Sequence, residues 1–204
     1  KATKEKLPKL RQRVQFGLAA LDLIPSTIGQ SQSSYLVLLQ NNTELRPTGG
    51  FINSYAILNF QNGRLSDYSV SDIHTADSQL SGHVDPPAPL KIHLDLNWFA
   101  RDANWYPDFS LSAKQVQWFL QKELNLTFDG VLALDLEAIK TFLKDTGPIL
   151  DSTGQTITAD NLYQIANQKS QIDFSSPNNT GQDFLTDLFN TLLTHIKTTP
   201  PPLI

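Results

Sequence analysis

The segment 35–51, YLVLLQNNTELRPTGGF, changes from an apolar run to a polar loop within a few residues. Its first five residues are all apolar, which is typical of a central strand with both faces buried. The residues that follow supply amides, a carboxylate, an arginine and a glycine pair. Because loops at strand ends present binding groups on a rigid base, we expect a binding site here.

Strand-like and helix-like patterns alternate along the rest of the chain. Further strands are expected at 51–60, 65–73 and 128–135, and helices at 110–123, 136–144, 158–168 and 182–197. The pair Asn62-Gly63 predicts a tight hairpin turn, and the segments 74–97 and 169–181 are predicted to be loops. This interleaving predicts an α/β fold, a three-layer α-β-α sandwich with a mixed central sheet.

The predicted domain covers residues 35–197, with an N-terminal helix and linker at 1–34 and a proline-rich tail at 198–204. The helix is expected at 4–22, where one apolar stripe contains Leu7, Leu10, Val14, Leu18 and Leu21. It either packs on the domain edge, the interpretation we favour, or forms a stalk. Because the chain starts at Lys1 and has no methionine, we expect it to be a piece of a longer protein.

Composition excludes several kinds of site. The chain has 204 residues, a net charge of -4 and a pI near 5.5, which argues against a nucleic-acid groove. It has no cysteine, so disulfides, thiolate metal sites and cysteine nucleophiles are excluded. No Gly-x-Ser-x-Gly elbow of a serine hydrolase and no apolar run of about 20 residues is present.

The loop at 41–50 is the first candidate site. Arg46 has a planar guanidinium that binds carboxylate or phosphate, and Gly49-Gly50 would let backbone amides approach a ligand. The alternative is a turn in which Arg46 pairs with Glu44 or caps a carbonyl.

The segment 101–109, RDANWYPDF, is the second candidate site. It precedes a predicted helix, whose free amides favour anions, and Asp102 and Asp108 could instead hold magnesium. The alternative is a buried arginine–aspartate pair that fixes an irregular loop, with Trp105 as a packing residue. At the end of the third predicted strand, Asp72 is a candidate metal ligand or general base, or a turn cap.

Four stretches of the chain are specific enough to compare with known families: LLQNNTELRPTGGFI at 38–52, RDANWYPDF at 101–109, FDGV at 128–131 and TGP at 146–148. They resemble a bacterial envelope family known as domain of unknown function 4012. Members of that family are typically anchored by an upstream transmembrane helix and face outward. The resemblance therefore implies a domain on the extracellular face of the cell membrane.

The order of elements is also similar to the LytR-CpsA-Psr phosphotransferases, which move a glycopolymer from a polyprenyl pyrophosphate carrier onto peptidoglycan with magnesium. The Ser69-Val70-Ser71-Asp72 segment falls where that family has Ser-Ile-Pro-Arg-Asp. Asn167 and Lys169 stand where an arginine pair is expected. The resemblance thus implies the fold, while most of the arginine clamp for phosphoryl transfer is missing.

Together these features predict an outward-facing envelope domain that binds a polyprenyl-phosphate-linked or acidic glycan ligand. Arg46, Arg101 and Asp102 would act on the phosphate; Glu44, Asn104, Trp105 and Lys169 would bind the ligand; and Asp72 and Asp108 would hold Mg²⁺. The arginines, with Asp102, Asn104 and Asp108, would line one cleft. The alternative is a non-catalytic extracellular interaction or scaffold module.

Overall fold

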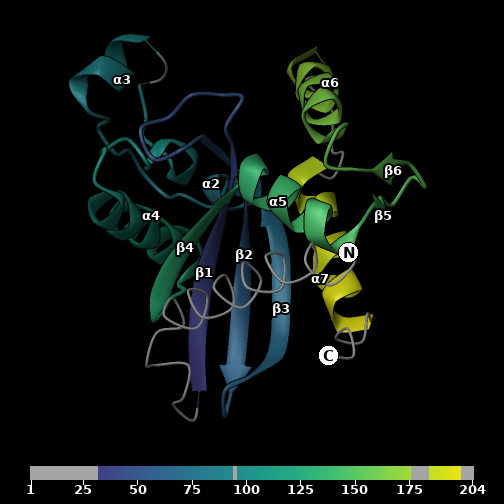
Figure 1. The fold of residues 1–204 in the computed structure, drawn as a ribbon. Coiled ribbons are helices and arrows are strands. Elements are labelled where there is room, and N and C mark those ends of the chain that lie inside the picture. The colour runs from purple at the N-terminus through teal and green to yellow at the C-terminus, as the bar shows by residue number, and fades with distance from the viewer. Residues whose placement is uncertain (1–31, 94–95, 176–183, 199–204) are drawn as a thin grey trace, which may run out of the picture.

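A four-stranded sheet forms the centre of the molecule, with strand order β3-β2-β1-β4 (Figure 1). Its strands are β1 (Gln32–Asn41), β2 (Phe51–Gln61), β3 (Arg64–Asp72) and β4 (Gly130–Asp135). β1 pairs antiparallel with β2 and parallel with β4, and β2 pairs antiparallel with β3. The predicted mixed α/β architecture is therefore confirmed. The computed structural model describes residues 32–93, 96–175 and 184–198, so the predicted helix at 4–22 and nearly all of the tail lie outside them.

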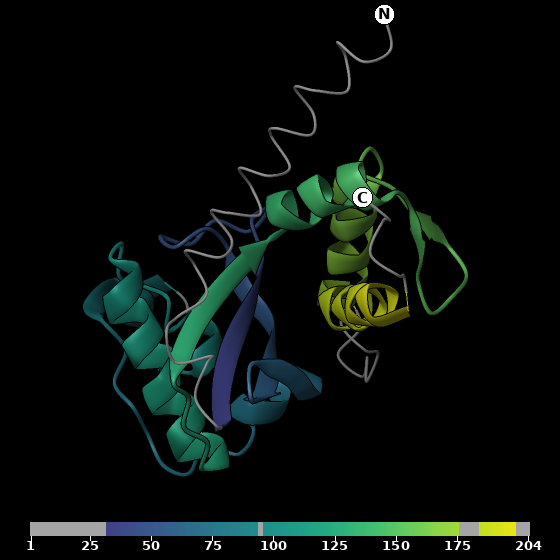
Figure 2. The ribbon, with the colours of Figure 1, turned by 60° about the horizontal axis from the view of Figure 1, so that its bottom comes forward.

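Helices cover both faces of the sheet (Figure 2). They are α2 (Ile73–Asp77), α3 (Ala88–His93), the 3-10 turn η2 (Ala100–Asp102), α4 (Phe109–Leu124), α5 (Leu136–Thr146), α6 (Leu162–Ser175) and α7 (Phe184–Thr198). A short hairpin of β5 (Ile149–Leu150) and β6 (Thr156–Ile157) joins α5 to α6.

β1 contributes to two separate cores because successive side chains of a strand point to opposite faces. Val37 and Leu39 belong to the first core, with α5, α6 and α7. Leu36 and Leu38 belong to the second core, with α2, η2 and α4. Burial on both faces explains why this strand is apolar at every central position.

Local sequence signals explain most of the element boundaries. Asn62 and Gly63 have φ angles of 51° and 76°, as the predicted hairpin turn requires. α4 does not begin at Ser110 as predicted. The Asp108 carboxylate accepts hydrogen bonds from the Ser110 and Leu111 amides and caps the helix two residues earlier, so that α4 begins at Phe109.

Two predicted loops were wrong in part. The segment 74–97 contains most of α2 and all of α3, which are too short for a clear periodic signal. The segment 169–181 begins inside α6, which extends to Ser175. The Thr158 hydroxyl accepts from the Asn161 amide, and the helix starts only at Leu162.

Candidate functional site

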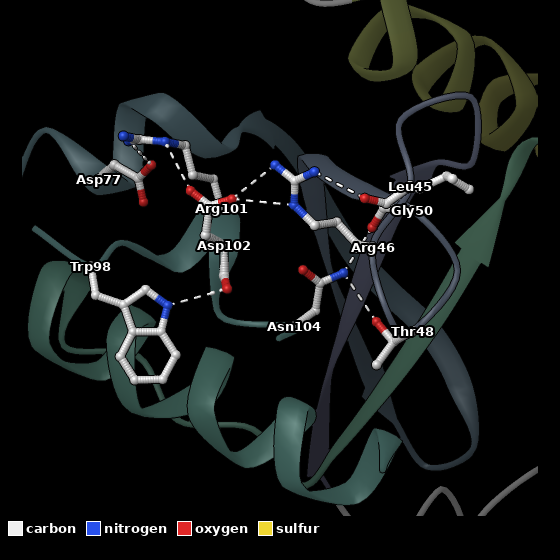
Figure 3. Close-up of polar contacts among 9 residues, drawn as sticks. All are labelled: Leu45, Arg46, Thr48, Gly50, Asp77, Trp98, Arg101, Asp102 and Asn104. Carbon is white, nitrogen blue, oxygen red and sulfur yellow. Dashed lines mark hydrogen bonds and ion pairs between the residues drawn. The ribbon is translucent and has the colours of Figure 1, made fainter. Parts of the chain in front are cut away.

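The β1–β2 loop and the η2 segment, which are far apart in sequence, lie against each other (Figure 3). Arg46 donates from Nη2 and Nε to Asp102 Oδ1, at 3.0 and 3.3 Å. Its Nη1 donates to the carbonyl of Leu45 at 3.0 Å. The predicted meeting of the two candidate segments is therefore observed, but Arg46 uses its donors on the chain itself.

Arg101 continues this pairing on the other side of Asp102. Its Nη1 donates to Asp77 Oδ2 at 2.8 Å, and its Nε lies 3.6 Å from Asp102 Oδ2. Asp77, Arg101, Asp102 and Arg46 thus form a chain of alternating charges, called here the charge network. The two arginine side chains are 20% exposed, and those of Asp102 and Asp77 are 12% and 4% exposed.

Aromatic rings cover the guanidinium groups as well. The Arg46 Cζ lies 4.9 Å from the centre of the Phe51 ring, and the Arg101 Cζ lies 4.2 Å from that of Phe99. Stacking on a ring face is favourable for a guanidinium and excludes water from that face. Both arginines are therefore fixed by carboxylates at their edges and by rings on their faces.

Buried amides reinforce the contact between the two segments. Asn104, which is fully buried, donates from Nδ2 to the Gly50 carbonyl at 2.7 Å and to the Thr48 hydroxyl at 3.0 Å. The same hydroxyl accepts from Gln40 Nε2 at 3.0 Å. Asn104, predicted to bind a ligand, thus holds the loop backbone in place.

The glycine pair in this loop allows a close approach to the chain's own backbone. Gly50 has a φ of 156°, and a Cβ added there would lie 2.5 Å from the backbone carbonyl of Asn41. Gly49 has a φ of 117°. We predicted that these glycines would let a ligand approach, but the group that approaches Gly50 is the end of β1.

Two buried carboxyl groups at this site were not predicted from the sequence. Asp77 and Glu123 are 5% and 8% exposed. Asp77 Oδ1 and both Glu123 oxygens have no hydrogen-bond partner of good geometry among the described residues. Glu123 continues the buried stripe of Val116, Phe119 and Leu120 on α4, and a charged residue in such a stripe is the signal that could have identified it.

Burial changes the acidity of both groups. Desolvation, followed by the charge of Asp77, raises the pKa of Glu123 from 4.5 to about 7, and the Ala100 amide and Arg101 only moderate the shift. Desolvation also raises the pKa of Asp77 above its usual value, in spite of its bond to Arg101. The second core therefore holds a carboxyl group that titrates near neutral pH.

The other predicted site residues have local roles. Asp72 caps α2 by accepting from the His74 amide, and Asp108 caps α4. Glu44 accepts from Asn41 within the loop. Trp105 packs half-buried against the second core. Lys169 lies on α6, whose buried residues belong to the first core, so it is not part of the charge network.

The described part of the chain contains no group of three or more histidine, aspartate or glutamate side chains arranged to hold a metal ion. Within the same residues, no helix is long and apolar enough to cross a membrane. The magnesium ligands predicted at Asp72 and Asp108 are each occupied as helix caps.

Sequence comparison identifies the family of the chain. A family model described as a protein of unknown function, DUF4012, matches residues 30–170. The chain belongs to the DUF4012 family. The matched range of this DUF4012 domain includes the whole charge network, the β1–β2 loop and Glu123, and it ends before α7. No curated protein and no solved structure matches the chain.

Proposed function

We propose that this DUF4012 domain is a non-catalytic interaction module of the bacterial cell envelope, and that it binds a cell-wall glycan. One observation carries the choice over phosphoryl transfer: both guanidinium groups are already engaged by Asp102, Asp77 and two phenylalanine rings. Catalysis of phosphoryl transfer needs such groups free to meet the developing charge. In this chain they hold two loops together instead.

The fixed loops carry exposed side chains suited to a sugar. Leu45 is 87% exposed beside the fixed Arg46, and Tyr106 and Phe109 are each 37% exposed after the η2 segment. Aromatic and apolar faces pack against the C–H faces of sugar rings, while neighbouring polar groups bond the hydroxyls. A rigid support lowers the entropy lost when these side chains bind.

A second candidate function has one observation in its favour. Asp102 lies between Arg46 and Arg101, so a phosphate that displaced this carboxylate would meet two guanidinium groups at once. The ligand would then be a polyprenyl phosphate, with Mg²⁺ held by residues such as Asp72 and Asp108. This candidate retains phosphotransferase chemistry of the LytR-CpsA-Psr type.

The proposal includes a fold relationship and a location. Helices on both faces of a mixed sheet support a three-layer α-β-α sandwich related to the LytR-CpsA-Psr fold. We further propose that the domain lies on the extracellular face of the membrane with an anchor upstream of this chain, as the resemblance to envelope proteins implies. A single cysteine introduced into this cysteine-free domain can be labelled in intact cells with an impermeant maleimide, with the unsubstituted full-length protein as the background control. Labelling only after the cells are opened would contradict this location.

The experiment that separates the two functions measures ligand binding by calorimetry. Purified domain is titrated with peptidoglycan glycan fragments, and separately with polyprenyl phosphate with and without Mg²⁺. We expect glycan binding that falls about fivefold in Phe109→Ala, because each aromatic contact is worth roughly 1 kcal/mol. Lys122→Ala, on the exposed side of α4, is the matched control and should bind normally.

Polyprenyl phosphate binding that requires Mg²⁺ and is lost in both Arg46→Ala and Arg101→Ala would overturn the proposal in favour of the second candidate. Absence of glycan binding in the wild-type domain would also overturn it. Circular dichroism of each variant distinguishes a lost site from a lost fold.

A further inference from the structure

A hollow of about 770 Å³ lies between α5 and α7. These two helices lie on the side of the sheet opposite α4 (Figure 2). Leu134 of β4 lies at its base, and Phe189, Leu192 and Leu193 of α7 form one wall. The other wall comes from α5, including Ala138, Thr141, Phe142 and Asp145. We call this hollow the α5–α7 groove.

The two walls have the spacing of helix faces. Positions 138, 141, 142 and 145 recur at intervals of three and four, so they form one side of α5. A groove between two such faces can receive a third, amphipathic helix, which inserts side chains at i, i+3, i+4 and i+7. The spacing of the walls is therefore compatible with a docked helix.

The charged residues that line the groove are all acidic: Asp135, Glu137 and Asp145. Asp135 caps α5 through the Ala138 amide, and Glu137 accepts from the Tyr163 hydroxyl with Lys140 Nζ 3.8 Å away. These contacts leave the lining acidic as a whole. An occupant with basic residues beside an apolar face would match it.

The sequence before β1 has this composition. Residues 4–22 carry the apolar stripe of Leu7, Leu10, Val14, Leu18 and Leu21. The first thirteen residues contain the basic residues Lys1, Lys4, Lys6, Lys9, Arg11 and Arg13, with Glu5 as the one acid. Both the apolar spacing and the sign of the charge therefore complement the groove.

The connection to β1 is long enough for this contact. Leu134 pairs with Leu39, so the base of the groove lies seven residues along β1 from Gln32, or about 23 Å at 3.3 Å per residue. Residues 23–31 can extend to about 30 Å. Attachment to the same chain also gives the segment a high effective concentration at the groove.

We propose that residues 4–22 occupy the α5–α7 groove of their own chain as an amphipathic helix. The stripe residues contact Phe142, Leu192 and Leu193, and the basic residues lie along the acidic rim. The groove is then an internal docking surface, and a partner that binds it must displace this segment. This inference does not depend on the glycan or phosphate specificity of the charge network.

Cysteine crosslinking tests the proposal in the full chain, which has no native cysteine. Thr141→Cys, at an exposed position on the α5 wall, is combined in turn with Leu10→Cys, Val14→Cys or Leu18→Cys. Disulfide formation in oxidised glutathione is followed by non-reducing electrophoresis and peptide mass. At least one of these pairs is expected to form an intrachain bond about tenfold faster than the controls.

Two control pairs of cysteines accompany this experiment. Gln12→Cys with Thr141→Cys places the thiol on the opposite face of the predicted helix from Leu10 and Val14. Val14→Cys with Gln121→Cys places the second thiol on α4, across the sheet from the groove. Equal rates in test and control pairs would overturn the proposal. Bonds formed only between chains would also overturn it, since a second copy would then be the occupant.

Discussion

The two sides of the sheet hold their outer elements by different means. On the α4 side, charged and amide groups join the β1–β2 loop to η2, and each arginine is paired within the chain. On the α5–α7 side, apolar residues pack the helices and leave a groove with an acidic rim. The polar segments most suggestive of a ligand site are thus used for internal structure, whereas the less conspicuous apolar side has a groove that can receive a further helix.

The energetic difference between the sides explains this division. Charges removed from water are costly, and they are tolerated when every group finds an opposite charge or a hydrogen bond. The charge network meets this condition except at Asp77 Oδ1. This oxygen and those of the neighbouring Glu123, which lies outside the network, have no partner of good geometry among the described residues, and this favours protonation of both groups. The α5–α7 side carries no comparable requirement, because its packing is mainly hydrophobic.

The largest effect is expected where the β1–β2 loop meets the end of β1. In Gly50→Ala, the new Cβ would lie 2.5 Å from backbone atoms of Asn41, and the φ of 156° is unfavourable for alanine. We expect a loss of roughly 4 kcal/mol in the free energy of unfolding, measured in urea. Gly154→Ala is the control, because its φ of 82° is also positive but no atom lies within 4 Å, and it should cost only about 1 kcal/mol. Equal losses would contradict a tightly closed loop.

The α4 side should also respond to pH. The pKa of Glu123 is raised from 4.5 to about 7, so the folded state favours the protonated form. Its stabilising contribution is complete below pH 4.5 and is lost as the pH rises through 7. Glu123→Gln removes this titration, so the variant should gain about 2 kcal/mol relative to the wild type between pH 5 and pH 8.

The measurement is urea unfolding of both proteins across that pH range. Asp67→Asn, at an exposed position on β3, is the control and should track the wild type. A difference between wild type and Glu123→Gln that does not change with pH would show that Glu123 is not held in a desolvated environment.

A smaller loss in the free energy of unfolding is expected from a substitution at the centre of the charge network. Asp102→Asn keeps the shape of the side chain but leaves Arg46 and Arg101 without the charge between them. Because these side chains are partly exposed, we expect only about 1.5 kcal/mol of destabilisation. Because they are mostly buried, salt should change this loss little. A gain in stability would indicate that the two arginines are poised for an external anion.

The smallest effect should come from the exposed ion pair before α3. Asp85 lies 2.7 Å from Lys91 Nζ, and both side chains are about half exposed or more. Such pairs contribute little because water screens them. Asp85→Asn should leave the unfolding curve unchanged at pH 7. A loss comparable with that of Asp102→Asn would remove the contrast between the charge network and ordinary surface pairs.

Much of the fold could be predicted from the sequence because its signals are local. The apolar run at 35–39, the Asn62-Gly63 turn and the Gly147 helix end each determine the backbone within a few residues. α2 and α3 were missed because helices of five and six residues have too few turns to show a period. The helix at 4–22 stays a prediction.

The sequence identified most residues of the candidate site, but it did not show which groups those residues contact. The sequence drew attention to Arg46, Arg101, Asp102 and Asn104, which do come together. Whether an arginine faces solvent or a carboxylate depends on residues brought close by folding. Asp77, on a short helix that the sequence did not predict, is such a residue. The closed pairing therefore could not be derived from the two segments alone.

A double-mutant cycle on Arg46 and Asp102 tests most directly whether these charges serve internal structure. Unfolding free energies are measured for the wild type, Arg46→Gln, Asp102→Asn and the double variant. The account predicts a coupling energy of about 1 kcal/mol or more, as expected for a partly buried ion pair with two hydrogen bonds. If the losses in unfolding free energy of the two single variants add up to that of the double variant within about 0.3 kcal/mol, the account is contradicted, because the two side chains then contribute independently.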